Sequence, residues 1–200
     1  MTNERMSANP FATRFIRPGA IPFLFLDGDS AEAIIERLRS HNWRGQIIGA
    51  HGSGKSTLLL TLVPLIEAAG RNVVLYKLGP GERRLPNIDT SSISPATQLI
   101  IDGYEQLSSW SRLRIGWLVW RSKAGLLATA HADVGLPTIY ATNPSEAIAA
   151  AVANQLTAAE SVSVTANDIS EAFRAAGGNV RETLFKLFDV LQSRRMTNND

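Results

Sequence analysis

One nine-residue stretch combines glycines, a lysine and hydroxyl side chains in the pattern G-x-x-x-x-G-K-[ST]: Gly49-Ala50-His51-Gly52-Ser53-Gly54-Lys55-Ser56-Thr57. Such glycines let the backbone curl so that its N–H groups point at phosphate oxygens, and a following helix adds the partial positive charge of its N-terminus. The Lys55 ammonium then reaches the β- and γ-phosphates, and the Ser56 hydroxyl can ligate Mg²⁺. The pattern predicts a phosphate-binding loop, or P-loop; a chance glycine turn is the plain alternative.

A carboxylate ends an apolar run, Leu99-Ile100-Ile101-Asp102. Ligands of open α/β sheets bind at the carboxyl ends of the strands, so we expect Asp102 to face the Mg²⁺ of the P-loop. The alternative is an aspartate that only caps the next turn. Glu105 is the nearest further acid. It is equally well interpreted as the group that activates the attacking water or as a first-turn acid that complements a helix dipole.

Polar groups follow a further apolar run, in Thr129-Ala130-His131. If this strand lies between the strand of the P-loop and that of Asp102, Thr129 or His131 lies near the γ-phosphate. The alternative for His131 is a loop histidine that hydrogen-bonds to backbone. Which of its nitrogens carries the proton is not readable from sequence.

Arg181 follows a glycine corner, Gly177-Gly178-Asn179-Val180. The glycines allow a tight turn between two helices, and Arg181 would project from the first turn of the second. A guanidinium suits phosphate oxygens. From the residues alone, an ion pair of Arg181 with Glu182 or Asp168 is the preferred interpretation.

Alternating strands and helices position these groups. We expect strands at 46–50, 72–78, 98–102, 125–130 and 137–141, and helices at 31–40, 55–69 and 106–123. The alternation implies an α/β fold with a parallel sheet of about five strands sandwiched by helices. Three helices then follow without a strand, at 145–156, 166–176 and 180–195. We therefore divide the chain into an N-terminal extension and helix (1–43), a P-loop NTPase core (44–143) and a small helical lid-like subdomain with a tail (144–200).

The composition is that of a globular protein. Of the 200 residues, 44% are hydrophobic and 19% charged, which is enough apolar surface for a core. The net charge of +2 gives no support for a nucleic-acid partner. Without cysteine there are no disulfides or thiolate metal sites. Residues 1–18 lack the apolar block of a signal peptide, and no run is long enough to span a membrane, so we expect a cytoplasmic protein.

Residues 44–192 resemble an AAA+ ATPase or a close relative. The resemblance rests on the P-loop, on Asp102 with the following Gly-Tyr-Glu, on Thr129-Ala130-His131 and on the Gly-Gly-Asn-Val-Arg corner. It implies ATP and Mg²⁺ as cofactors, a Walker B role for Asp102, a sensor 1 role for Thr129 or His131, and a sensor 2 role for Arg181. The whole chain also resembles small uncharacterised ATP-binding proteins of planctomycete-type bacteria.

The sequence departs from the AAA+ pattern at two points. Gly103 stands where many relatives carry the glutamate that follows the Walker B aspartate, and no Arg or Lys lies between His131 and Pro144, where an arginine finger is usual. Arg112, Arg114 or Arg121 could substitute for the finger. Efficient hydrolysis and ring assembly are therefore left open.

The helix expected at 106–123 carries three tryptophans, interleaved with basic residues. Trp110, Leu113 and Trp117 follow helical spacing, which favours a core face. The alternative is a contact with a protein partner or with nucleic acid.

The preferred function is an AAA+-like ATPase that couples nucleotide binding and hydrolysis to a conformational change on a macromolecular partner. One alternative is a small-molecule kinase whose lid would be the loop of Glu82-Arg83-Arg84. Another is a nucleotide-dependent switch without hydrolysis. The choice between ATP and GTP, the partner and the oligomeric state stay open.

Overall fold

The computed structural model describes residues 9–26, 28–85, 88–158 and 164–197. The sequence also predicts polar tails at residues 1–9 and 196–200, and these lie mostly outside the described residues. Asn9, which was assigned to the first tail, is instead buried, and its Nδ2 donates to the carbonyl of Phe188 at 3.0 Å. The last helix also continues past the expected end, because Met196 and Thr197 still belong to it.

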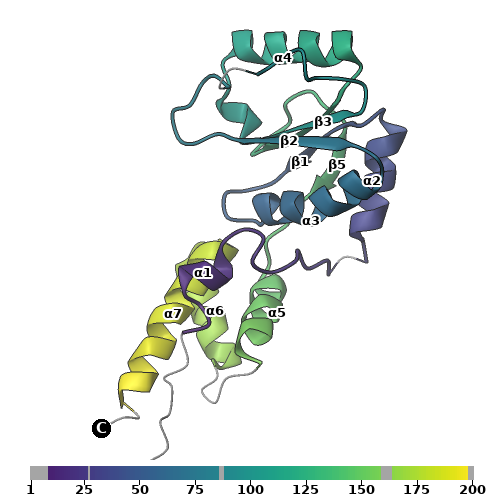
Figure 1. Ribbon diagram of the computed structural model, residues 1–200. Coiled ribbons are helices and arrows are strands. Elements are labelled where there is room, and N and C mark those ends of the chain that lie inside the picture. The colour runs from purple at the N-terminus through teal and green to yellow at the C-terminus, as the bar shows by residue number, and fades with distance from the viewer. Residues whose placement is uncertain (1–8, 27, 86–87, 159–163, 198–200) are drawn as a thin grey trace, which may run out of the picture.

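The core of the fold is a parallel sheet of five strands, which confirms the expected fold class. The strands are β1 (Arg44–Ile48), β2 (Asn72–Lys77), β3 (Thr97–Asp102), β4 (Gly125–Ala130) and β5 (Thr138–Ala141). They lie in the order β2-β3-β4-β1-β5 (Figure 1). As expected, β4 lies between the strand of the P-loop and the strand of Asp102. The ends of β1, β3 and β4 therefore meet at one edge of the sheet.

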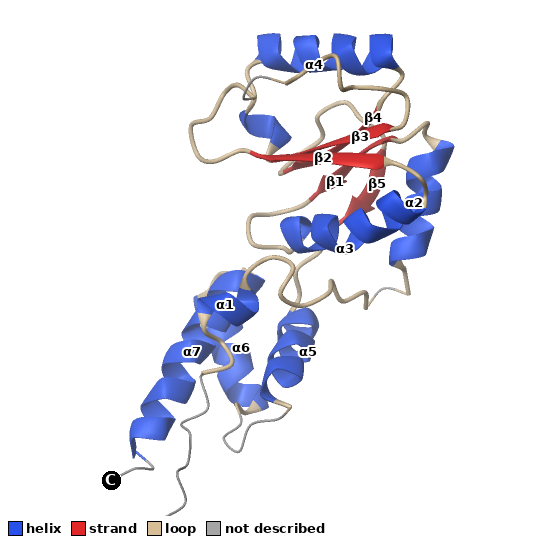
Figure 2. Cartoon of the chain, in the orientation of Figure 1, coloured by secondary structure: helices blue, strands red, loops and turns tan. Residues whose placement is uncertain are grey.

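Helices cover both faces of the sheet (Figure 2). On one face lie α2 (Ala31–Ser40) and α3 (Lys55–Ala68), and on the other a single helix, α4 (Ser109–Ser122), follows the short 3₁₀ turn η1 (Tyr104–Gln106). Serine side chains cap α2 and α4 at their N-termini. Strand β3, which lies between β2 and β4, is buried on both sides, since Leu99, Ile100 and Ile101 are fully inaccessible.

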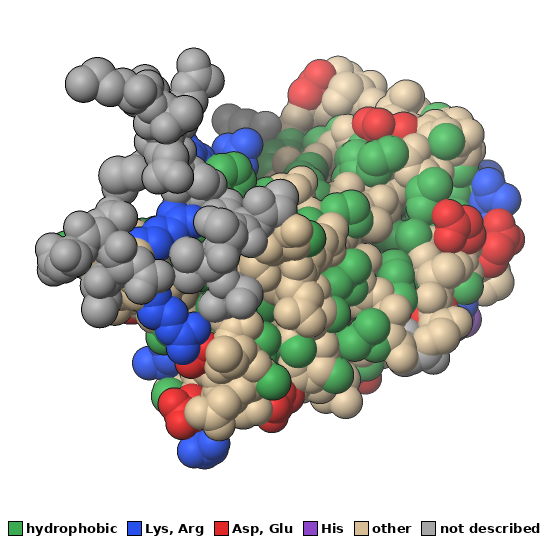
Figure 3. Space-filling view, turned by 90° about the horizontal axis from the view of Figure 1, so that it is seen from below, with side chains coloured by type: hydrophobic (Ala, Val, Ile, Leu, Met, Phe, Trp, Pro, Cys, Tyr) green, Lys and Arg blue, Asp and Glu red, His purple; other side chains and the backbone are tan. Residues whose placement is uncertain are grey.

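The C-terminal helices form a bundle with its own core. They are α5 (Glu146–Thr157), α6 (Ala166–Ala175) and α7 (Val180–Thr197). An N-terminal segment with the short helix α1 (Thr13–Ile16), which the sequence did not indicate, packs against them, and its Phe11 is fully buried in the bundle core. Figure 3 views the molecule from the side of this bundle, where hydrophobic side chains are scattered among polar ones. Among the described residues no helix has the length and apolar character needed to cross a membrane.

The prediction that the tryptophans of α4 face the core is wrong. Trp110, Trp117 and Trp120 are 69%, 60% and 70% exposed. Instead, α4 packs on the sheet through Ile115 and Val119, which are buried against side chains of β3 and β4. The helix has apolar side chains on two faces, and the compact aliphatic face is the one that fits the pleated sheet surface.

Candidate functional site

The predicted P-loop connects β1 to α3. Its backbone needs glycine at two positions, because Gly52 and Gly54 have φ of 72° and 93°. Gly49 allows a close approach: a Cβ there would lie 2.0 Å from Thr142 Oγ1, the group that also contacts the Ser53 hydroxyl at 2.5 Å. Gly54 is the N-cap of α3, so the loop leads directly into the N-terminus of that helix.

Lys55 is held over the loop. Its Nζ donates to the carbonyls of Gly49 and Ala50 at 2.6 and 2.7 Å, and lies 3.5 Å from Nδ1 of His131. Burial lowers the pKa of Lys55 below its ordinary 10.5, and the carboxylates of Glu105 and Asp102 oppose this shift. A partly desolvated ammonium that forms no ion pair among the described residues is suited to an anionic ligand.

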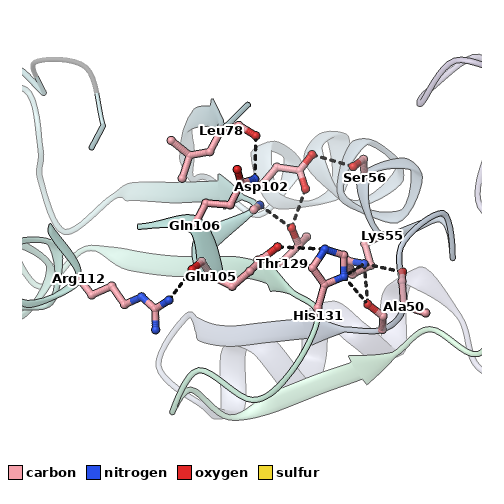
Figure 4. A network of polar contacts seen from close by, with 12 residues as sticks. Ala50, Lys55, Ser56, Leu78, Asp102, Glu105, Gln106, Arg112, Thr129 and His131 are labelled. Atoms are coloured by element: carbon pink, nitrogen blue, oxygen red, sulfur yellow. Dashed lines mark hydrogen bonds and ion pairs between the residues drawn. The ribbon is translucent and has the colours of Figure 1, made fainter. Parts of the chain in front are cut away.

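Asp102 lies at the centre of a short hydrogen-bonded chain between α3, β3 and β4 (Figure 4). Ser56 Oγ donates to Asp102 Oδ2 at 2.7 Å, and Thr129 Oγ1 donates to Asp102 Oδ1 at 2.6 Å. Thr129 in turn accepts from the backbone N–H of Gly103 at 2.9 Å. The aspartate therefore does not serve as a turn cap alone, since both of its oxygens are oriented by hydroxyls from neighbouring elements.

Glu105 and His131 face each other across the same edge of the sheet. Oε1 of Glu105 lies 3.2 Å from Nε2 of His131, whose Nδ1 lies 3.3 Å from the carbonyl of Gly49. The second oxygen, Oε2, is buried and has no hydrogen-bond partner among the described residues. Arg112 holds the backbone of this turn, because its Nη2 donates to the Glu105 carbonyl at 2.6 Å. A buried carboxylate oxygen with no partner is a vacant acceptor for a water or ligand hydrogen.

These groups line a cavity of about 260 Å³ between the sheet edge, the bundle and the N-terminal segment. One end is polar and contains P-loop residues 51–57, Asp102, Glu105, Thr129 and His131. The other end is mainly apolar, with walls from the segment before α2 and from the bundle: Ile16, Pro18, Ile148, Val152, Val180 and Leu184. The cavity thus combines a polar part, at the P-loop and the sheet edge, with an apolar part, at the bundle and the N-terminal segment.

The glycine corner before α7 reaches the P-loop. Gly177 and Gly178 have φ of 59° and 81°, so the corner requires their conformational freedom. The amide of Asn179 packs so closely on Gly52 that a Cβ on this glycine would lie 2.0 Å from Asn179 Oδ1. Arg181 lines the cavity from the bundle side, with its guanidinium 5.7 Å from the ring centre of Phe185.

The sequence favoured an ion pair of Arg181 with Glu182 or Asp168. Neither ion pair is present among the described residues. Asp168 is instead bound by Arg194, with two contacts of 2.7 and 2.8 Å between α6 and α7. Arg181 forms no ion pair with any described acid, and it is among the residues that line the cavity.

Most of the predicted site residues lie together, although two contribute in another way. Gly49 and Ala50 do not line the cavity, but their carbonyls hold Lys55. The residues of the expected kinase lid, Glu82-Arg83-Arg84, do not line it. Sequence reasoning missed the cavity wall formed by residues 16–18 and 21–24. The available signal was the extended apolar segment just before α2, which contains Ile21 and Phe23.

Comparison with known proteins supports the fold. No family model matches the chain, and neither does any curated protein. A solved structure described as a DNA replication initiation factor is similar, with a TM-score of 0.52 and 14% sequence identity. The alignment covers 82% of this chain and 63% of that one, so the present chain spans less than two thirds of its length. At this identity the likeness is one of fold; the resemblance to planctomycete-type proteins stays a prediction.

Proposed function

We propose that this protein binds ATP with Mg²⁺ in the cavity, hydrolyses it, and couples both steps to movement of the helical bundle on a macromolecular partner. The observation that carries the proposal is the convergence of Lys55, the Ser56–Asp102–Thr129 chain and the N-terminus of α3 at one end of the cavity. This combination offers backbone N–H groups, a helix dipole and an ammonium to a row of phosphates.

The donor set fits Mg²⁺. The Ser56 hydroxyl and an Asp102 carboxylate oxygen lie 2.7 Å apart beside the P-loop, and both are hard oxygen ligands. Among the described residues there is no cluster of three acidic, His or Cys side chains that could hold a metal alone. This supports Mg²⁺ rather than a caged metal, because Mg²⁺ is usually held by one or two protein oxygens together with substrate phosphates. The bound ion would neutralise charge on the phosphates, and Thr129 would keep the carboxylate aimed at it.

Glu105 is the best candidate to orient the attacking water. Its Oε2 is buried without a partner among the described residues, while His131 holds Oε1. The histidine also reaches the P-loop carbonyl of Gly49 and lies near Lys55. A ligand that displaces the ammonium from these carbonyls would therefore alter the surroundings of His131. We infer that the surroundings of His131 depend on whether a phosphate is bound, and that His131 transmits this difference to Glu105 through their contact.

The apolar end of the cavity suits the base of the nucleotide. Its walls come from the N-terminal segment and from α5 and α7, so a bound base would touch the bundle directly. Arg181 enters from the same side, and a guanidinium contact with a phosphate would add a second link. Bound ATP would thereby favour one arrangement of the bundle, by as much as its affinity for the two arrangements differs.

The alternatives receive less support. The kinase proposal required basic or acidic groups from residues 82–84 in the cavity, and they do not line it. The fold of a replication initiation factor favours action on a macromolecule over action on a metabolite. A switch without hydrolysis differs from an ATPase only in the activity of Glu105, so turnover decides between them.

Calorimetric titration with ATP and Mg²⁺ tests the proposal. Lys55→Ala removes one charge-assisted contact, which contributes about 1.5–3 kcal/mol, so we expect affinity to fall by roughly ten- to a hundredfold. Lys186→Ala, an exposed change on α7, removes the same charge away from the cavity and should bind like the wild type. Equal affinities for wild type and Lys55→Ala would refute the nucleotide site.

Phosphate release under saturating ATP then separates the ATPase from the switch. We expect Glu105→Gln to abolish turnover with little loss of ATP affinity. Asp102→Asn should weaken the Mg²⁺ dependence of binding itself. If the wild type releases no phosphate, alone or with an added partner, while binding ATP tightly, the switch is the correct description.

A further inference from the structure

The outer face of α4 carries an unusual concentration of exposed apolar side chains. Trp110, Leu113, Trp117 and Trp120 are 69%, 63%, 60% and 70% exposed. They are spaced at 3, 4 and 3 residues, which places them in one stripe along the helix, and we call these four residues the α4 stripe. In Figure 1 this helix forms the layer of the molecule farthest from the bundle, and no other described element covers its outer side.

The spacing of the α4 stripe is that of a coiled-coil seam. Counting Trp110 as a, the stripe occupies positions a, d, a and d of two heptads, the pattern by which one helix packs against another. Gly116 and Ser109 lie on one flank of the stripe, and a Cβ at Gly116 would meet nothing within 4 Å. With Trp117 and Trp120 these small residues line a shallow groove. Small residues let a second backbone approach closely, so the groove fits a helix.

The charges beside the stripe indicate which kind of partner it would bind. Arg114 and Arg121 are exposed, stand seven residues apart and occupy the e positions of the two heptads. Arg121 lies 6.0 Å from the ring centre of Trp117. No Asp or Glu occurs from Gln106 to Ala132. Two α4 helices placed face to face would therefore bring arginines together without any acid to pair with them. A second copy of this chain is disfavoured, and a partner with carboxylates is favoured.

The exposed area of the stripe also disfavours a second copy of this chain as the partner. A tryptophan exposes at most about 250 Å² of side chain, so the four residues together offer about 400–600 Å². A stable interface between two folded proteins needs about 800 Å² from each side. The stripe alone is thus too small for a dimer of globular chains but matches one helix laid in a groove, the mode in which a few apolar anchors carry the binding.

We propose that the α4 stripe is a docking site for an amphipathic helix of another protein, with apolar residues at its a and d positions and Asp or Glu flanking them to pair with Arg114 and Arg121. The partner helix inserts its apolar side chains beside Gly116 and between the tryptophans. Binding at this face does not require nucleotide, since α4 lies on the opposite side of the sheet from α3.

Two labelled peptides of about three heptads provide the probes, both with Leu at a and d, one with Glu and the other with Lys at e and g. Like charges keep each peptide from pairing with itself. Fluorescence anisotropy in about 0.1 M salt measures binding to the wild-type protein, to Trp117→Ala/Trp120→Ala and to Arg114→Glu/Arg121→Glu. Met196→Ala and Lys186→Glu, both at exposed positions on α7, are the matched controls.

We expect the Glu peptide to bind at least about tenfold more tightly than the Lys peptide, and the tryptophan variant to lose about tenfold or more of that affinity. The arginine variant should reverse the preference, while both controls and Lys55→Ala should bind like the wild type. Binding of neither peptide, equal binding of both, or binding unaffected by the tryptophan variant would overturn the proposal. It also fails if the stripe instead mediates self-association, or binds oligo-dT or anionic vesicles more tightly than the Glu peptide.

Discussion

Thr129→Val removes a single oxygen atom from the centre of the candidate site. Thr129 is 1% exposed, and its Oγ1 donates to Asp102 at 2.6 Å and accepts from the N–H of Gly103 at 2.9 Å. Valine has nearly the same shape, so the change deletes both hydrogen bonds and leaves the packing of β4 in place. The perturbation therefore isolates the orientation of the Asp102 carboxylate.

The size of the effect follows from these two contacts. A hydrogen bond to a charged group contributes about 1.5–3 kcal/mol, and a buried N–H without a partner costs about 1–3 kcal/mol. Asp102 is only half-buried, so water replaces part of the loss, and we expect the free energy of unfolding to fall by about 2–3 kcal/mol. In a protein of this size, that lowers Tm by about 4–12 °C. Loss of a group that orients a metal ligand typically weakens metal affinity by about ten- to a hundredfold, which should appear in Mg²⁺-dependent ATP binding.

Thr129→Ser is the matched control. It keeps the hydroxyl and loses one buried methyl group, which costs about 0.8 kcal/mol, so Tm should fall by only about 2–3 °C. Its Mg²⁺-dependent affinity should equal that of the wild type. Thermal unfolding and calorimetry on the three proteins give both quantities. If Thr129→Val keeps the Tm and the Mg²⁺-dependent affinity of the wild type, Thr129 does not orient Asp102 and the reasoning is refuted.

Three further predictions concern the bundle and its contact with the P-loop. Gly52→Ala should lower Tm and ATP affinity much more than Gly70→Ala. Both glycines have positive φ, 72° and 80°, but only at Gly52 would a Cβ meet another side chain, at 2.0 Å, and similar losses would contradict the contact. Burial raises the pKa of Asp168, yet hydrogen bonds within the α6 cap and the guanidinium of Arg194 outweigh this and lower it below 3.8. Its contribution to stability is thus present above about pH 4 and lost as pH falls through the lowered pKa, so denaturation of Asp168→Asn and wild type should differ at neutral pH and converge once the pH lies below the lowered pKa. Arg181→Ala should bind ATP but lose the difference in hydrogen-exchange protection of the bundle between an ATP analogue and ADP, with Arg181→Lys restoring it only in part; equal protection in the wild type would argue against a moving bundle.

The parts of the fold that could be predicted from sequence are those where local chemistry determines the backbone. The glycines of the P-loop, the apolar run before Asp102 and the glycine corner before α7 each require one local conformation. The strands and helices around them were therefore expected within a few residues of their observed bounds. The confirmed sheet order then brings Asp102 and Thr129 to the same edge of the sheet, although the sequence around neither residue indicates their contact.

The parts that could not be predicted depend on tertiary packing. Helical spacing identifies an apolar face on α4 but not which of two apolar faces the sheet accepts, and the sheet took Ile115 and Val119 instead of the tryptophans. The N-terminal residues are polar enough to resemble a tail, yet Phe11 finds a fully buried place among α5, α6 and α7. Contacts of this kind join residues more than a hundred positions apart, and no local pattern encodes them.

The burial of Phe11 has a mechanical consequence for the candidate site. The segment that Phe11 anchors to the bundle continues through Arg17 and Pro18, which line the cavity, and Phe23 is tied to α3 by a hydrogen bond from its N–H to Thr61 at 2.9 Å. Asn179, in the glycine corner before α7, contacts Gly52 of the P-loop. The bundle is thus linked to the P-loop through its glycine corner and to the apolar part of the cavity through the N-terminal segment. A ligand that fills both parts of the cavity touches both links, and a rotation of the bundle cannot occur without changing the shape of the cavity. A ligand can shift the position of the bundle only through contacts that differ between its two arrangements. The two links between the bundle and the cavity provide such contacts, as a coupling of nucleotide occupancy to bundle position requires.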